Sequence, residues 1–202
     1  MNQMRSWLIW AALALAIAVP VVLAGTSPLL AWREPVYIAA GFAGVIGLVL
    51  LLVQPLLAGG YMPGLPMPRG RYVHRAVGAL LVIAVMVHVG GLWITSPPDV
   101  VDALLFVSPT PFSAWGVIAM WAIFAAALMA VLRKRFRGRL RVWRLGHTSL
   151  AILIVAGTVI HALLIEGTME TVSKLLLCAL ALVATAKIVV DTRAWVLLRN
   201  PR

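Results

Sequence analysis

The sequence predicts an all-α membrane protein, a bundle of six transmembrane helices with both termini in the cytoplasm. Three observations predict this fold class. The chain of 202 residues is 63% hydrophobic, with a mean hydropathy of +1.03, which is far above the value of a soluble domain. Its apolar residues fall into runs of about 20, the length that a helix needs to cross the hydrocarbon core of a bilayer. Its cations gather in alternate loops, which the positive-inside rule assigns to the cytoplasm.

The apolar runs form one transmembrane domain over residues 1–202, because no connection between them is long enough for a separate soluble domain. Backbone polar groups within lipid must find partners in their own segment, so each run is expected to be a helix. The expected spans, in chain order, are 7–24, 36–57, 72–94, 113–132, 146–166 and 172–190.

Breaks between the spans are marked by composition. The first span ends at a Gly-Thr-Ser-Pro segment, 25–28, and the second leads into a connection rich in glycine and proline, 58–71. The connection 95–111 has four prolines and two aspartates, and we expect it to cover the outer end of the bundle. The last span holds the single cysteine, Cys178, which we interpret as a packing residue.

The formal charge of +11 follows this topology, so we interpret it as a topological signal and exclude nucleic acid as a partner. The segments expected inside hold most of the cations, and the segments expected outside hold most of the acids. The inside cations are Arg5, Arg69, Arg71, Arg133, Lys134, Arg135, Arg137, Arg139, Arg141, Arg144, Arg193, Arg199 and Arg202, and the outside acids are Glu34, Asp99, Asp102, Glu166 and Glu170. Near the inner end of the last span, Lys187 and Asp191 are four residues apart and predict an ion pair.

All four histidines lie in two of the spans, His74 and His88 in 72–94 and His147 and His161 in 146–166. Each pair is fourteen residues apart, which returns to within roughly 40° of the same helix face and separates the rings by roughly 21 Å. Both spans run outwards, so His74 and His147 are expected to face each other near the cytoplasm. We call them the inner pair, and we call His88 and His161 the outer pair.

Two imidazoles on opposite sides complete the coordination of iron in a b-type haem, so the sequence predicts two haem b groups, one at each pair. Small residues lie one turn from each histidine, toward the bilayer centre, and are expected to make room for a flat ring: Gly78, Ala84, Ala151 and Gly157. Between the levels, Leu81 and Ile154 are expected to separate the rings. The cations expected to bind haem propionates are Arg71, Arg75 and Arg144 at the inner pair, with Arg33 and Lys174 as the candidates at the outer pair.

An alternative assigns the histidines to hydrogen bonds between helices of a haem-free membrane scaffold or transporter. No span carries Asp, Glu, Lys or Arg at its middle, where an ion-coupled transporter would need such residues. The sequence also lacks a glycine-rich dinucleotide fingerprint and a flavin module. We therefore expect an electron-transfer component of an oxidoreductase, with no catalytic residues of its own, and not a self-sufficient enzyme.

Two motifs carry a resemblance to a known family: His74-Arg75 with Gly78 and then His88, and the segment 143–147, Trp-Arg-Leu-Gly-His, followed by His161. With them the chain resembles the ferric reductase-like transmembrane domain superfamily. Members include ferric-chelate reductases, NADPH oxidases and the haem-binding membrane subunit of the bacterial periplasmic methionine sulfoxide reductase system. The chain is similar to this last, stand-alone type of haem subunit.

The resemblance implies a b-type cytochrome of the bacterial inner (cytoplasmic) membrane that passes electrons from the inner haem to the outer one. It implies a cytoplasmic flavin reductase or membrane quinol as donor, so that flavin or quinone comes from a partner. The implied acceptor is an extracytoplasmic protein, or a ferric or other oxidant. A quinol-oxidising cytochrome b subunit of a larger redox complex has the same histidine spacing and is the alternative function.

Overall fold

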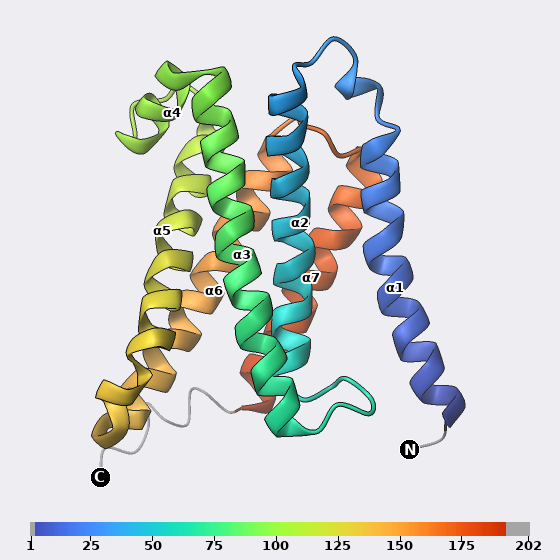
Figure 1. Ribbon diagram of the computed structural model, residues 1–202, viewed down its shortest axis with the longest axis vertical. Coiled ribbons are helices and arrows are strands. Elements are labelled where there is room, and N and C mark those ends of the chain that lie inside the picture. The colour runs from blue at the N-terminus through green and yellow to red at the C-terminus, as the bar shows by residue number, and fades with distance from the viewer. Residues whose placement is uncertain (1–2, 193–202) are drawn as a thin grey trace.

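The computed structural model describes residues 3–192, and every regular element in that part of the chain is a helix. The long helices stand side by side as rods, and a short helix lies across one end of the bundle (Figure 1). In chain order the elements are α1 (Gln3–Gly25), the 3-10 helix η1 (Pro28–Leu30), α2 (Pro35–Ala58), α3 (Met67–Thr95), α4 (Pro97–Leu104), α5 (Pro111–Val131), the 3-10 helix η2 (Leu132–Arg139), α6 (Leu140–Leu164) and α7 (Thr171–Asp191).

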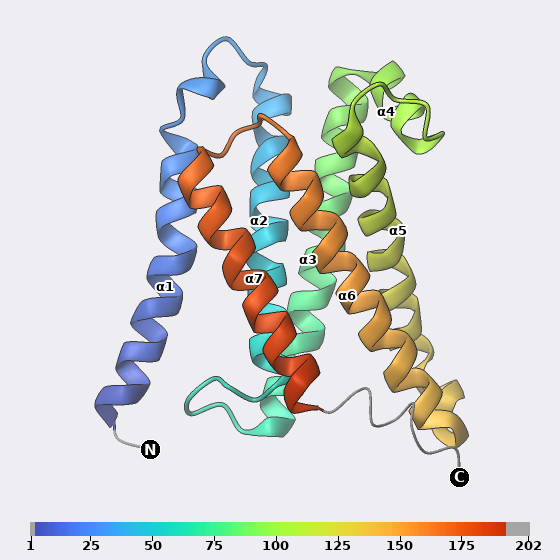
Figure 2. The same ribbon diagram turned by 180° about the vertical axis from the view of Figure 1, so that it is seen from behind.

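Within residues 3–192, five helical stretches are long and apolar enough to cross a membrane, so the chain is a multi-pass membrane protein. One of the five, Pro111–Leu164, includes α5, η2 and α6. Figures 1 and 2 show α5 and α6 as two separate rods that are joined at one end through η2. Six crossings and the cytoplasmic placement of the termini stay predictions.

The third helix begins earlier than predicted, at Met67 and not at residue 72. The expectation took the charged and proline-containing segment 66–71 as loop. Proline is tolerated in the first turn of a helix, where its missing N–H has no acceptor in any case, and here it stands within that turn.

The bundle is built from two antiparallel helix pairs, α2 with α3 and α5 with α6. Helix α7 packs against α2 and α6, and α1 lies at the edge against α7 and α2. Along their whole described lengths, α3 and α6 hardly bring any Cα atoms within 8 Å of each other. As predicted for the two histidine-bearing spans, α3 and α6 run in the same direction (Figures 1 and 2). We call the end at which both begin the inner end.

Two clusters of buried side chains hold these helices together. The larger one lies between α1, α2, α6 and α7 and includes Leu177 and Cys178, which confirms that the cysteine is a packing residue. The smaller one joins α2, α3, α5 and α6. It contains Leu81 and Ile154, each about 6% exposed, together with Leu51, Ala122, Ile123 and Ala126. The two residues predicted to lie between the histidine levels are therefore buried in one cluster.

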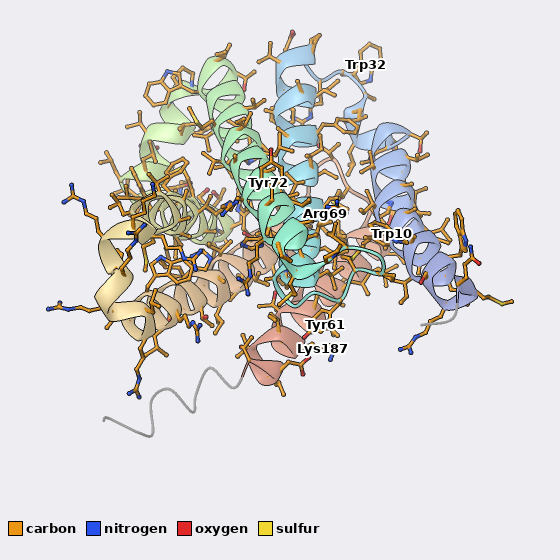
Figure 3. All side chains as sticks on the ribbon, turned by 60° about the horizontal axis from the view of Figure 1, so that its bottom comes forward. Trp10, Trp32, Tyr61, Arg69, Tyr72 and Lys187 are labelled. Carbon is orange, nitrogen blue, oxygen red and sulfur yellow. The ribbon has the colours of Figure 1, made fainter. Side chains whose placement is uncertain are left out.

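The inner end of α7 is tied to the connection between α2 and α3. The predicted ion pair is present, with Lys187 Nζ 2.8 Å from Asp191 Oδ2. The Tyr61 hydroxyl donates a hydrogen bond to the same carboxylate, and Lys187 Nζ lies 4.8 Å from the centroid of the Tyr61 ring. Figure 3 shows Tyr61 and Lys187 next to each other at this end. Burial, the hydrogen bond that the hydroxyl donates to Asp191 and the charge of that carboxylate raise the pKa of Tyr61 from 10.0 to about 12. The cations Arg193, Arg199 and Arg202, expected after α7, lie outside the described residues.

Candidate functional site

The four histidines meet as two pairs in the space between α3 and α6. The ring centroids of His74 and His147 are 6.4 Å apart, with an angle of 73° between the planes. The centroids of His88 and His161 are also 6.4 Å apart, at 81°. The structure thus brings together the predicted partners at both levels, the inner pair and the outer pair.

The separation of the rings fits two imidazoles that share one metal ion. A bond from a metal to an imidazole nitrogen is about 2.0 Å, and that nitrogen lies roughly 1.2 Å from the centroid of a ring with bonds near 1.35 Å. Two rings on opposite sides of one ion would therefore have centroids roughly 6.4 Å apart. Edge-to-face rings in direct contact span about 4.5–7 Å, so one pair alone would not distinguish the two arrangements. The centroid distance is the same at both levels, and three of the four rings are held by the hydrogen bonds described below. Together these observations favour one ion shared by the two rings of each pair.

Three of the rings are fixed by backbone carbonyls of the neighbouring helices. His74 Nδ1 donates to Gln54 O at 3.2 Å on α2. At the outer pair, His88 Nδ1 donates to the Ala40 carbonyl of α2 at 2.7 Å, and His161 Nδ1 to the Phe112 carbonyl of α5 at 2.8 Å. A carbonyl can only accept, so the proton is on Nδ1 and the lone pair is on Nε2. Metal-binding histidines are commonly oriented in this way.

His147 is held differently. Its Nδ1 is buried and has no hydrogen-bond partner among the described residues. The indole of Trp143, one turn earlier on α6, stacks on the ring with centroids 5.0 Å apart and planes at 9°. The indole is fixed in turn, because Trp143 Nε1 donates to the Met129 carbonyl at 2.9 Å and the Arg133 guanidinium lies 5.2 Å from the indole centroid. Stacking thus orients the one ring that lacks a carbonyl.

Two glycines make room for the outer rings, and the sequence analysis missed both. A Cβ placed on Gly44 would lie 3.1 Å from His88 Nδ1, and one placed on Gly116 would lie 2.7 Å from His161 Nδ1. Each glycine is four residues after the residue whose carbonyl accepts from that histidine. The sequence does hold a signal for these glycines. Ala40 precedes His88 by 48 residues and Phe112 precedes His161 by 49, so each glycine stands at nearly the same distance before its histidine.

A cavity of about 450 Å³ surrounds the outer pair, and both His88 and His161 line it. This volume is within the range of sites for small molecules and cofactors. The cavity extends from the midplane residues Leu51, Leu81 and Ile123 to α4, so the connection 95–111 covers the outer end as predicted. Polar side chains gather at that end, namely Thr95, Ser96, Asp99, Ser108, Thr110, Ser113 and Lys174.

The arginines predicted to bind a cofactor near the inner pair, Arg71, Arg75 and Arg144, are exposed side chains of α3 and α6. None of the three lines the cavity. Of the two candidates for the outer pair, Lys174 lines the cavity, whereas Arg33 lies over the Tyr37 ring at 5.0 Å. A role of these cations in binding a cofactor stays a prediction.

The glycines Gly78 and Gly157 serve helix packing. A Cβ on Gly78 would lie 3.0 Å from Gln54 Nε2 of α2, and one on Gly157 would lie 3.2 Å from Ala119 Cβ of α5. The structure therefore accounts for both residues by the close approach of helices, and their predicted contact with a cofactor is untested.

Among residues 3–192, no group of three or more His, Cys, Asp or Glu side chains is placed to hold a metal ion. The described histidines therefore offer two nitrogen ligands at each level, with the remaining positions around an ion left to another group. A flat tetradentate ring is a group of that kind.

The family described as "Ferric reductase like transmembrane component" matches residues 40–158 of the chain. The matched segment begins in α2, ends in α6 and covers more than half of the chain. It includes the inner pair and His88 and ends shortly before His161. No curated protein and no solved structure matches the chain.

Proposed function

Because the chain belongs to the ferric reductase like transmembrane component family, we propose that it is a b-type cytochrome that carries electrons across the membrane. His74 and His147 would hold an inner haem, and His88 and His161 an outer one. In this proposal the six spans cross the inner membrane of a bacterium, with the inner end of the bundle in the cytoplasm.

The single observation that carries the proposal is the ring separation of 6.4 Å at both levels. This separation is the one expected for two imidazoles that share one metal ion. A porphyrin also needs room beside the ion, and α3 and α6 keep their backbones apart. At the outer level the cavity of about 450 Å³ provides that room directly.

The chain's own residues prepare both sites for this role. The carbonyls of Gln54, Ala40 and Phe112 keep Nδ1 protonated and leave Nε2 free as a ligand. The buried apolar cluster at the midplane separates the two levels. Haem, when bound, supplies one-electron redox chemistry, while the protein supplies ligands, spacing and a dry environment.

We place the donor at the inner end, as a cytoplasmic flavin reductase or a membrane quinol, and the acceptor at the outer end, as an extracytoplasmic protein or a ferric or other oxidant. A histidine on each side of both sites leaves no open ligand position for a substrate. The acceptor therefore reacts from the polar outer end of the cavity and not at a metal.

The test is the haem content per chain, measured by pyridine haemochrome on the wild type and on four His→Ala variants. We expect two haems in the wild type and one in each variant. His74→Ala and His147→Ala should give the same remaining spectrum, and His88→Ala and His161→Ala should share another. A wild type without Soret absorbance, after expression with ample haem, would instead support the haem-free scaffold or transporter.

A further inference from the structure

The outer cavity contains a buried cation. Lys174, on the first turn of α7, is only 8% exposed, and of the described residues that line the cavity it is the one with a positive charge. Its Nζ donates one hydrogen bond, to the Ile165 carbonyl at 2.8 Å. An ammonium group has three N–H donors, so this contact leaves most of its hydrogen-bonding capacity to the cavity.

No carboxylate among residues 3–192 lies within ion-pair distance of Lys174. The acid that is closest in sequence, Glu170, caps α7 by accepting from the backbone N–H groups of Val172 and Ser173. Asp99 also lines the cavity, but it is exposed and accepts a hydrogen bond from Ser96 Oγ. Both carboxylates are thus directed to other partners.

A buried charge is costly unless an opposite charge and hydrogen bonds compensate it. Lys174 also stands at the N-terminal end of α7, where the helix dipole is positive, so the helix adds to the local positive potential. An anion bound in the cavity would compensate this charge.

We propose that Lys174 binds a carboxylate of the molecule that occupies this cavity, and that this carboxylate is a propionate of the outer haem. The inference rests on the proposed function. It orients the outer haem with its propionate edge toward α7 and the outer end of the bundle. It also places a positive charge beside the outer site, which favours the reduced state there.

The experiment compares the full-length wild type with Lys174→Met, which keeps the length of the side chain but removes the charge, and with Lys174→Arg, which keeps the charge. Lys187→Met, on the same helix but away from the cavity, is the matched control. The readouts are retention of haem during transfer to an excess of apomyoglobin and the reduction potentials from an optical redox titration.

We expect Lys174→Met to release the outer haem roughly ten- to hundredfold more readily, the usual effect of losing a charged hydrogen bond. The haem that remains at the outer pair should titrate at a lower potential, with the inner one unchanged. Lys174→Arg should be close to the wild type, and Lys187→Met should equal it. Reconstitution with haem dimethyl ester should abolish the difference in haem retention between wild type and Lys174→Met.

Equal retention and equal potentials in the wild type and Lys174→Met would overturn the inference. So would a difference in haem retention that persists with the dimethyl ester, because the lysine would then act on something other than a propionate. Both results presuppose that the wild type binds haem, so they leave the proposed function standing. A wild type that binds no haem would instead refute the proposed function itself.

Discussion

Under the proposed function, replacing Gly116 by alanine is expected to disturb the outer haem site and leave the inner one intact. The added Cβ would lie 2.7 Å from His161 Nδ1 and 2.9 Å from Cε1, whereas ordinary contacts begin near 3.4 Å. The ring therefore has to move by about 0.7 Å. Metal–ligand distances vary by only about 0.2 Å, so the displaced ring cannot keep its bond to an ion midway to His88.

The expected magnitude follows from two opposing effects. Overpacking of a tight contact costs about 1–3 kcal/mol, and replacement of a helical glycine by alanine returns about 1 kcal/mol. The net loss is therefore up to about 2 kcal/mol, which corresponds to up to roughly 30-fold weaker retention of the outer haem. Gly44→Ala should have a smaller effect, because its Cβ would lie 3.1 Å from His88 Nδ1 and the ring needs to move by about 0.3 Å.

The assay is haem per chain and retention against apomyoglobin for the three alanine variants at Gly116, Gly44 and Gly90. The last is the matched control, because a Cβ on Gly90 meets no atom within 4 Å although it is two residues from His88. The expected order of outer-haem loss is Gly116→Ala, then Gly44→Ala, with Gly90→Ala equal to the wild type. Wild-type retention in Gly116→Ala would refute the view that these glycines set the position of the outer ligands.

Two further predictions concern contacts at the inner end. Trp143→Ala removes the indole that stacks on His147. Under the proposed function, the low-spin ferric EPR signal of the inner haem should then change its g anisotropy, which depends on the angle between the planes of the two imidazoles. Trp121→Ala, at an exposed position of α5, should leave both signals unchanged, and an unaltered inner signal in Trp143→Ala would contradict the positioning role. The free energy of unfolding should fall as the pH rises from 10 to about 12. The reason is that the pKa of Tyr61 is 10.0 in the unfolded chain and about 12 in the folded protein. Tyr61→Phe should not show this fall, and its absorbance titration should lack the tyrosinate step at the highest pH. Identical pH profiles of the wild type and Tyr61→Phe would argue against the contact with Asp191.

The sequence alone predicted the pairing of the histidines, because that pairing depends on quantities that are local to each helix. The helical period puts residues fourteen apart on one face, and the alternation of charged loops makes the two helices run in the same direction. These two facts are enough to place His74 opposite His147 and His88 opposite His161. The burial of Leu81 and Ile154 between the levels follows from the same periodicity.

What the sequence did not predict depends on the neighbouring helices. The carbonyls that fix the rings belong to α2 and α5, and which turn of those helices faces a histidine is set by how the pairs pack. Gly78 and Gly157, predicted to lie against a ring, approach α2 and α5 closely, and their contact with a ring stays a prediction. Glycine is suited to both purposes, and only the packing of the helices decides between them.

The two levels differ in ways that bear on electron flow under the proposed function. At the outer pair both ligands donate Nδ1–H to a carbonyl, at 2.7 and 2.8 Å, whereas the inner pair has one such bond, at 3.2 Å. Such bonds make an imidazole a more basic ligand, which favours the oxidised state and lowers the potential of the outer site. The charge of Lys174 acts in the opposite direction at the same site. At the outer site the carbonyls and the buried cation therefore act in opposite directions, and Lys174→Met would expose the effect of the carbonyls alone.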